Sequence, residues 1–346
     1  MRGNILNWIK SFLTDRSQSV VCEGERSSQA PVLSGVPQGT VLGPLLFLAY
    51  INDMPTSIDS TIRLFADDAL VYKTVKTTKD AQDLQKDLNL LQEWESKWQM
   101  EFNPDKCEVI RFTQKKKNVI LSDYSIHGRT LQLVDQAKYL GITLDSKLNF
   151  NHHIDNICKK ANRTRAFIHR NTKFCSRRTK IAAYNTLVRP QLEYCSTVWS
   201  PHTDTNIEKI QAVQRRAVRS VMNDWTTRRS NVQDNTKGSP TEMQKQLKWI
   251  PLEERRARAK IIMTYKIIKN LIDIPASHFT FNPRDTRQHN FIIYVTSVNT
   301  TMYLHSFFPS AIRLWNSISA YLVNSPSLDC LRGRLAKIRI LPKASY

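Results

Sequence analysis

Two adjacent carboxylates divide an apolar, β-prone stretch of this chain. Residues 63–72 read RLFADDALVY, with Asp67 and Asp68 between two runs suited to short strands. Neighbouring residues of an extended strand point to opposite faces, and two like charges disfavour each other's ionised form. The pattern therefore predicts a β-hairpin with the carboxylates at its tip, and these carboxylates need a compensating partner.

Two interpretations of the pair remain open from these residues alone. Aspartate is a common turn residue, so the pair is explained by an ordinary hairpin turn. Alternatively it holds a divalent cation, because Mg²⁺ takes oxygen ligands, is often held by one or two carboxylates and completes its shell with substrate phosphates.

The segment upstream of the pair changes character along its length. Residues 34–55, SGVPQGTVLGPLLFLAYINDMP, begin with Gly and Pro and then become apolar almost all round, which predicts an exposed turn followed by a buried helix. Glycines permit close backbone approach to a ligand, and Gln38 offers donors and an acceptor. An ordinary turn before a helix is the competing interpretation of this loop.

The segments after the pair complete a mixed fold. Residues 80–100 carry an apolar stripe that predicts an amphipathic helix covering one face of a sheet. Lys106 follows an Asn-Pro turn and precedes a short β-like run, and residues 137–145 predict a strand pair around Gly141. Helix, hairpin, helix, strand and hairpin together predict an α+β fold with helices packed on a small antiparallel sheet.

Four motifs in this order resemble one family. GVPQGTVLGPLLFLAYINDMP, FADD, FNPDKCEVIRF and KYLGITLD are similar to the palm of the right-hand polymerase fold in reverse transcriptases of non-LTR (LINE-type) retrotransposons, of the jockey and CR1-like kind. The resemblance continues through RPQLEYCSTVWSPHT and HSFFPSAIRLWNSI, nearly to the C-terminus. It implies an RNA-directed DNA polymerase, a nucleotidyltransferase acting on an RNA template, a DNA primer and deoxynucleoside triphosphates.

The resemblance also implies roles for individual residues. They are metal binding by Asp67 and Asp68; contact with template and incoming nucleotide by Pro37, Gln38 and Gly39; protonation of departing pyrophosphate by Lys106; and a grip on the primer end by Tyr139, Leu140 and Gly141. Two Mg²⁺ ions, or Mn²⁺ in their place, would activate the primer 3′-hydroxyl and stabilise the charge on the phosphates.

The family's metal site also uses an aspartate on a strand before the SGVPQG loop. Only Asp15 precedes that loop, and it lies in KSFLTDRSQ, which does not resemble the missing motif. The fingers region and an endonuclease domain are likewise expected upstream. We therefore expect the back half of a reverse transcriptase, beginning at an internal methionine and inactive alone, with a catalytically inactive nucleic-acid-binding remnant as the alternative.

The composition favours a polyanionic partner. Fifty-one Lys and Arg against 30 Asp and Glu give a net charge of +21 and a pI near 9.8. The longest apolar run, PLLFLAYI, is far shorter than the roughly 20 residues of a membrane-spanning helix. Six scattered cysteines without a CxxC pair, and an amphipathic rather than signal-like N-terminus, predict a reduced intracellular protein, in nucleus or cytoplasm.

The C-terminal half is predicted to be helical and basic. Candidate helices cover residues 153–170, 177–194, 206–222 and 252–271, and the third combines an apolar stripe with Lys209, Arg215, Arg216 and Arg219. These four side chains are candidates for contact with a nucleic-acid backbone, against the alternative of a solvated surface. The predicted domains are a partial palm at 1–150, a thumb-like region at 151–224, a flexible connection at 225–240 and a helical C-terminal region at 241–346.

Overall fold

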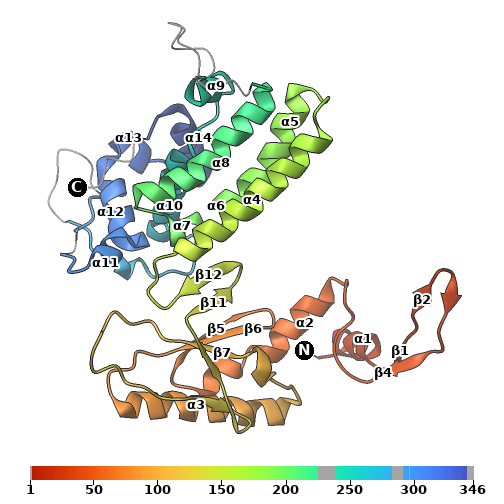
Figure 1. The fold of residues 1–346 in the computed structure, drawn as a ribbon. Coiled ribbons are helices and arrows are strands. Elements are labelled where there is room, and N and C mark those ends of the chain that lie inside the picture. The colour runs from red at the N-terminus through yellow and green to blue at the C-terminus, as the bar shows by residue number, and fades with distance from the viewer. Residues whose placement is uncertain (1, 225–238, 283–290, 296, 341–346) are drawn as a thin grey trace, which may run out of the picture. The chain divides into compact units, whose positions relative to one another are not determined.

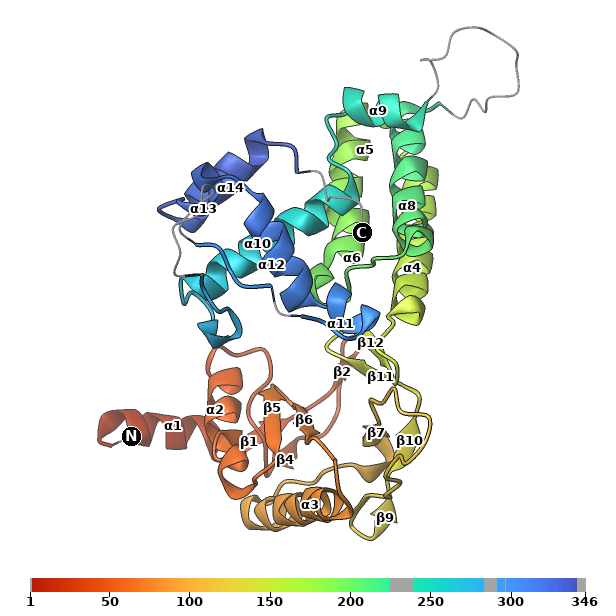
Figure 2. The same ribbon diagram turned by 90° about the vertical axis from the view of Figure 1, so that its left-hand side faces the viewer.

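The computed structural model describes residues 2–224, 239–282, 291–295 and 297–340. The chain divides into two compact units, Met1–Val134 and Asp135–Tyr346, and each is considered by itself (Figures 1 and 2). The first unit mixes helices with short strands, and the second is mainly helical. An α+β composition is thus confirmed, whereas the predicted domain boundaries stay predictions. Residues 225–238 of the expected connection lie outside the described residues.

The first unit contains two helices, α1 and α2, that expose several of their apolar side chains. The amphipathic N-terminus forms α1 (Asn4–Leu13), and the predicted helix behind the SGVPQG loop is confirmed as α2 (Leu42–Ile51). The prediction that this second helix is buried was wrong, because Leu45 is 59% and Leu48 49% exposed. An apolar run indicates a capacity for burial, but the described residues of this unit do not supply a covering surface.

The hairpin that carries the two aspartates packs against a long helix. Strands β5 (Thr61–Phe65) and β6 (Asp68–Tyr72) pair antiparallel, and α3 (Thr78–Trp98) follows them. A reciprocal capping box between Thr77 and Asp80 begins this helix. Apolar contacts then hold hairpin and helix in one core, whose buried members are Ile51, Met54, Ile62, Leu91 and Trp94.

The remaining elements of the first unit are short. Each ladder has two strands, and the pairs β1–β4, β2–β3 and β8–β9 are antiparallel, whereas β7 and β10 pair parallel. The prediction of one small antiparallel sheet was therefore wrong in this detail. The elements are β1 (Arg16–Gln18), β2 (Val21–Cys22), β3 (Glu25–Arg26), β4 (Ala30–Val32), η1 (Met54–Ser57), η2 (Pro104–Lys106), β7 (Glu108–Ile110), β8 (Ser125–Ile126), β9 (Arg129–Thr130) and β10 (Gln132–Val134).

The second unit opens with a hairpin and continues as helices, and all four predicted helices are confirmed. The segment predicted at 177–194 is α-helical at both ends, with a π-helical turn at Tyr184–Val188 between them. Pro190 follows this turn, in the first turn of the second α-helical part. The elements are β11 (Gln136–Tyr139), β12 (Ile142–Asp145), α4 (Asn151–Asn171), α5 (Arg177–Ala183), η3 (Tyr184–Val188), α6 (Arg189–Glu193), α7 (Ser196–Trp199), α8 (Asp204–Met222), α9 (Pro240–Gln246), α10 (Leu252–Ile268), η4 (Ala276–His278), α11 (Thr301–His305), α12 (Phe307–Ser317), α13 (Ala320–Val323) and α14 (Leu328–Lys337).

Two apolar cores hold the second unit together. One joins β12, α4, the segment from α5 to α7, and α8, around Ile154, Leu192 and Trp199. The other joins α10 to α12, α13 and α14, around Ile261 and Trp315. Helix α10 contributes to both, with Leu252 in the first core and Ile261 in the second, so it connects the basic helices to the C-terminal helices.

Helix α10 also buries a charge. Arg256 is 2% exposed, and neither terminal guanidinium nitrogen has a hydrogen-bond partner within the described residues. Burial lowers the pKa of Arg256 to about 10, although Glu253 and Glu193 act in the opposite direction. Its neighbour Arg255 instead makes a two-pronged ion pair with Glu193, with 3.0 Å between Nη2 and Oε2. Adjacent arginines on one helix thus have opposite electrostatic environments.

Candidate active site

The hairpin of β5 and β6 places the two aspartates at its tip, as the sequence predicts. Phe65 pairs with Asp68, so Ala66 and Asp67 form a two-residue turn, and Ala66 takes the left-handed conformation with φ of 50°. Such turns match the twist of the flanking strands. Both aspartates are exposed, whereas Ile62 and Val71 pack into the core on the same hairpin. The tip is thus a fixed point from which carboxylates project.

Both carboxylates are available as ligands. Within the described residues neither Asp67 nor Asp68 has an ion pair or a side-chain hydrogen bond, and both residues are exposed. Hard cations such as Mg²⁺ accept oxygen ligands of this kind. In the same part of the chain no three His, Cys, Asp or Glu side chains converge as a metal site. Asp15, exposed and left-handed with φ of 54°, therefore does not complete a set of three.

A buried carboxylate supports the start of the hairpin. Asp87 on α3 accepts hydrogen bonds from the Ser60 hydroxyl, from the Ser60 N–H at 2.9 Å and from the Asp59 N–H at 3.2 Å. Burial acts to raise the pKa of Asp87, but these hydrogen bonds and the nearby Lys73 ammonium outweigh it and keep the pKa below its ordinary value. The sequence analysis did not identify this residue. Its only sequence signal is the acid's place within an apolar stripe.

The Pro37–Gly39 loop is held against the first turn of α2 by hydrogen bonds. The Thr40 hydroxyl donates to the Pro37 carbonyl at 2.8 Å and accepts from the Gly43 N–H at 3.1 Å. A Cβ at Gly43 would lie 2.7 Å from the Pro37 oxygen, so the close approach requires glycine there. Gln38 and Gly39 are exposed. The loop therefore presents its polar side chain and backbone to solvent from a defined conformation.

Arg16 connects this loop to the N-terminal helix. Its Nε donates to the Leu13 carbonyl at 2.8 Å, and its Nη2 donates to the Gly35 carbonyl at 2.6 Å. One guanidinium thus joins the C-terminal end of α1 to the beginning of the loop, as its planar fork of donors permits. The sequence analysis missed this residue, since nothing in the local pattern distinguishes it from other surface arginines.

The remaining predicted site residues are divided between the units. Lys106 ends η2 in the first unit, where it is exposed and its backbone N–H donates to Asn103 at 3.0 Å. Tyr139, Leu140 and Gly141 belong to the second unit. The structure therefore groups Lys106 with the aspartate hairpin and the Gln38 loop in one unit, and assigns the Tyr139–Gly141 turn to the helical unit.

The Tyr139–Gly141 turn is attached to the helices by Tyr194. Leu140 and Gly141 have φ of 45° and 83°, and together they form the two-residue turn between β11 and β12. The Tyr194 hydroxyl donates to the Leu140 carbonyl at 3.1 Å, and the Tyr194 ring lies against Gly141. Tyr194 thus holds a turn whose left-handed leucine is unfavourable on its own. The sequence analysis did not identify this residue.

His153 provides a second attachment for the same hairpin. Its Nδ1 accepts a hydrogen bond from the Thr143 N–H at 3.2 Å, which requires a neutral imidazole. The ring is 3% exposed, lies 5.2 Å from the Trp199 ring, and has its pKa lowered by burial. Hairpin and helices therefore remain joined as long as His153 is uncharged.

Acid should loosen this attachment. Burial places the folded-state pKa of His153 below the value of 6.5 for an exposed imidazole, so the unfolded chain binds more protons between those two values. We expect protection of the Thr143 amide from hydrogen exchange to fall as pH drops from 6.5 through the folded pKa, and His153→Leu to remove this pH dependence. Protection that stays constant after correction for intrinsic exchange would contradict the attachment. The local amide is the proper probe, because burial also lowers the pKa of His169, His202 and His305.

The four basic candidates on α8 differ in their surroundings. Lys209 forms an ion pair with Asp155 at 2.7 Å, and Arg215 forms one with Glu208. Arg216 is exposed and donates to Asn162 at 3.4 Å, whereas Arg219 is partly buried. Two of these four charges are therefore already compensated within the chain. Their predicted contact with a nucleic-acid backbone stays a prediction.

Known proteins are similar in sequence to much of this chain. Residues 2–144 match the family model described as reverse transcriptase (RNA-dependent DNA polymerase). The RNA-directed DNA polymerase from mobile element jockey of Drosophila melanogaster is 32% identical over 245 residues, which cover 66% of this chain and 26% of the relative. The polymerase named for transposon X-element of the same organism is 30% identical over 242 residues, with the same two coverages. No solved structure matches.

Residues 2–144 match the reverse transcriptase family, and the chain is similar to polymerases named for the mobile elements jockey, BS and X-element, which are non-LTR retrotransposons. The resemblance inferred from the four motifs is thereby confirmed. The chain spans about a quarter of the length of these relatives. Among the described residues, every helix is too short or too polar to cross a membrane.

Proposed function

We propose that this chain supplies palm and thumb-like parts of an RNA-directed DNA polymerase that extends a DNA primer on an RNA template with deoxynucleoside triphosphates. The observation that carries the proposal is the hairpin tip with Asp67 and Asp68, whose exposed carboxylates have no partner within the described residues. An ordinary turn does not require two uncompensated adjacent charges. The tip also lies inside the segment that matches the reverse transcriptase family.

Asp67 and Asp68 are the residues proposed to hold the metal, Mg²⁺ or Mn²⁺. Bound Mg²⁺ would supply activation of the primer hydroxyl and charge neutralisation at the phosphates. The exposed Gln38 loop is proposed to contact template and incoming nucleotide, and Lys106 to protonate pyrophosphate. The turn at Leu140, fixed by Tyr194, is proposed to hold the primer end.

The proposed layout assigns a partial palm to residues 1–150 and a thumb-like region to 151–224. The helices from 241 onward would form a C-terminal region joined by the connection at 225–240. Support for a thumb-like part comes from α4 and α8, which pack along each other in one core. Their lengths and basic side chains suit a surface that follows a duplex.

A second candidate function is nucleic-acid binding without catalysis. It is favoured by the observation that no third His, Cys, Asp or Glu joins Asp67 and Asp68 among the described residues. Two-metal chemistry needs carboxylates that hold both ions, so two aspartates on one hairpin bind metal weakly and position the primer hydroxyl poorly. We therefore propose that the chain by itself binds template and primer but does not extend the primer.

Binding to nucleic acid should depend steeply on salt. The net charge of +21 predicts neutralisation of several phosphates, and for about six of them log K should fall with log salt at a slope near −5 on duplex DNA. Fluorescence anisotropy with a labelled duplex at several salt concentrations measures this slope, and unrelated sequences should give similar affinities. An affinity that is independent of salt would contradict the proposed electrostatic contact.

A further inference from the structure

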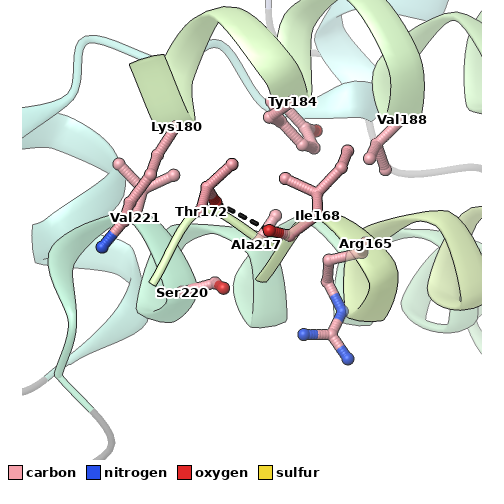
Figure 3. A pocket seen from close by; sticks show the side chains of 9 residues that line it. All are labelled: Arg165, Ile168, Thr172, Lys180, Tyr184, Val188, Ala217, Ser220 and Val221. Atoms are coloured by element: carbon pink, nitrogen blue, oxygen red, sulfur yellow. Dashed lines mark hydrogen bonds between the residues drawn. The ribbon is translucent and has the colours of Figure 1, made fainter. Parts of the chain in front are cut away.

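The helical unit contains a pocket that is too small for a ligand. It lies between α4, α5 and α8, and Figure 3 shows the side chains that line it. The space open to the centre of a water molecule is about 20 Å³, which is enough for about one water. The Thr172 hydroxyl in its wall already donates to the Ile168 carbonyl at 2.7 Å. The buried polar groups that bear on the proposed chemistry lie instead around Asp87, in the first unit.

The open end of the aspartate hairpin is held by one carboxylate. Thr61 and Tyr72 form the last ladder pair, at the end opposite the tip, and α3 lies below β5 and β6 in both views (Figures 1 and 2). Ser60 precedes this pair and Lys73 follows it. The Ser60 N–H donates to Oδ2 of Asp87 on α3 at 2.9 Å, and the Lys73 ammonium lies 4.0 Å from the same oxygen. One side chain therefore joins both strands of the hairpin to the helix.

The contacts at the open end are directional, unlike those along the hairpin. Ile62 and Val71 pack into the core beside α3 through apolar contacts, which stabilise without fixing an orientation. The buried Asp87 instead uses both carboxylate oxygens, Oδ1 for the Asp59 N–H and Oδ2 for the Ser60 N–H and hydroxyl. Such a network favours one arrangement of its members, because a buried donor left unpaired costs free energy. The open end is therefore fixed in direction as well as in place.

The length of the hairpin makes this direction important. Phe65, the last residue before the turn, comes five positions after Ser60. Five positions of a strand span about 16 Å. A tilt of about 4° at the open end would move the tip by roughly 1 Å, whereas a functional constellation tolerates about 0.5 Å. Small changes at Asp87 are thus amplified at Asp67 and Asp68.

A second acid on α3 provides a comparison within the same helix. Asp83 lies one turn before Asp87, and its carboxylate is also 4.0 Å from the Lys73 ammonium. The Asp83 side chain is 43% exposed, against 3% for that of Asp87. The N–H groups of Asp59 and Ser60 donate to Asp87 and not to Asp83. Asp83 therefore shares the charged partner of Asp87 but not the hydrogen bonds that hold the strand.

We propose that Asp87 is a positioning residue for the tip of the aspartate hairpin, acting through Ser60 and Lys73. It sets the direction in which Asp67 and Asp68 project, and does not itself touch metal, primer or nucleotide. This inference rests on the proposed function, in which the tip holds the metal. The rate of the chemical step then depends on Asp87, and not only the amount of folded protein.

The position of the tip can be measured in the full chain. Mn²⁺ bound at the tip broadens the amide NMR signals of α3 with the inverse sixth power of distance, and Asp67→Asn identifies the part of this broadening that comes from the tip. A displacement of roughly 1 Å, at about 12 to 20 Å from the ion, should change the broadening by about 1.3- to 1.6-fold. We expect this change in Asp87→Asn and none in Asp83→Asn.

A rate measurement separates positioning from folding. In the chain fused to an upstream segment of a jockey polymerase, single-turnover primer extension gives an amplitude, which counts competent molecules, and a rate constant. Asp87→Asn should lower the rate constant by about tenfold to a hundredfold, because misplacement of reacting groups is costly. Asp83→Asn removes an exposed charge and should change it by less than about twofold. Ser60→Ala, which removes the hydroxyl and keeps the N–H, should lie between them.

The outcomes distinguish three cases. A rate constant equal in Asp87→Asn and Asp83→Asn, with only the amplitude reduced in Asp87→Asn, would overturn the positioning role, as would unchanged Mn²⁺ broadening in Asp87→Asn. If Asp87→Asn does not fold, Ser60→Ala decides, and a rate constant equal to that of the wild type overturns the role. If the wild-type chain shows no broadening that depends on Asp67, the proposed metal site fails, and the positioning role fails with it.

Discussion

Primer extension should appear when the chain is fused to an upstream reverse transcriptase segment from a jockey polymerase, and Asp67→Asn should then lower it by about a thousandfold or more. The reason is that the hairpin supplies two free carboxylates, whereas the family's chemistry requires a further one. Loss of a metal-holding charge removes several kcal/mol of transition-state stabilisation, and each 1.36 kcal/mol is tenfold in rate. Incorporation of labelled deoxynucleotides on an RNA template with Mg²⁺ measures the effect.

The control for this experiment is Asp123→Asn, an exposed aspartate of the same unit outside the hairpin, which should leave extension unchanged. The unfused chain should give no detectable extension. Extension by the unfused chain that Asp67→Asn abolishes would show that a third ligand is already present, and Asp15 would be the first residue to test. Unchanged extension after Asp67→Asn in the fused protein would remove the hairpin from the active site.

Local signals in the sequence were sufficient to predict the aspartate hairpin and the helices. Two β-prone runs lie on either side of the turn near Asp67 and Asp68, so this short stretch specifies the whole hairpin. Periodic apolar residues define α3, α4, α8 and α10. These elements depend on interactions between residues a few positions apart. The same holds for the turn at Leu140 and Gly141, where glycine supplies one of the two left-handed positions.

Burial and long-range contacts could not be predicted in this way. The apolar run of α2 predicts burial, but burial also needs a covering surface, and Leu45 and Leu48 are exposed. Tyr194 reaches Leu140, and Lys209 reaches Asp155, each across 54 positions of the chain. Such pairings depend on how helices pack, which no local periodicity encodes. For this reason the attachments of the Leu140–Gly141 turn and the compensated charges on α8 emerged only from the structure.

The two adjacent arginines of α10 should respond in opposite directions to the same substitution. Arg256→Met should raise the free energy of unfolding of the helical unit by about 2 kcal/mol, because it removes a buried guanidinium whose terminal nitrogens have no hydrogen-bond partner in the described residues. The methionine side chain still fills much of the space. Urea unfolding followed by far-UV circular dichroism measures the change.

Arg255→Met is the matched control on the same helix. It breaks the ion pair with Glu193 and leaves a partly buried carboxylate whose remaining ion pair among the described residues is the 3.6 Å contact with Arg189. We expect a loss of about 1 kcal/mol. A loss of stability in Arg256→Met as large as that in Arg255→Met would mean that the Arg256 guanidinium has a partner in solution. In that case an increase in the melting temperature of the wild-type chain, but not of Arg256→Met, on adding phosphate would identify that partner as an anion.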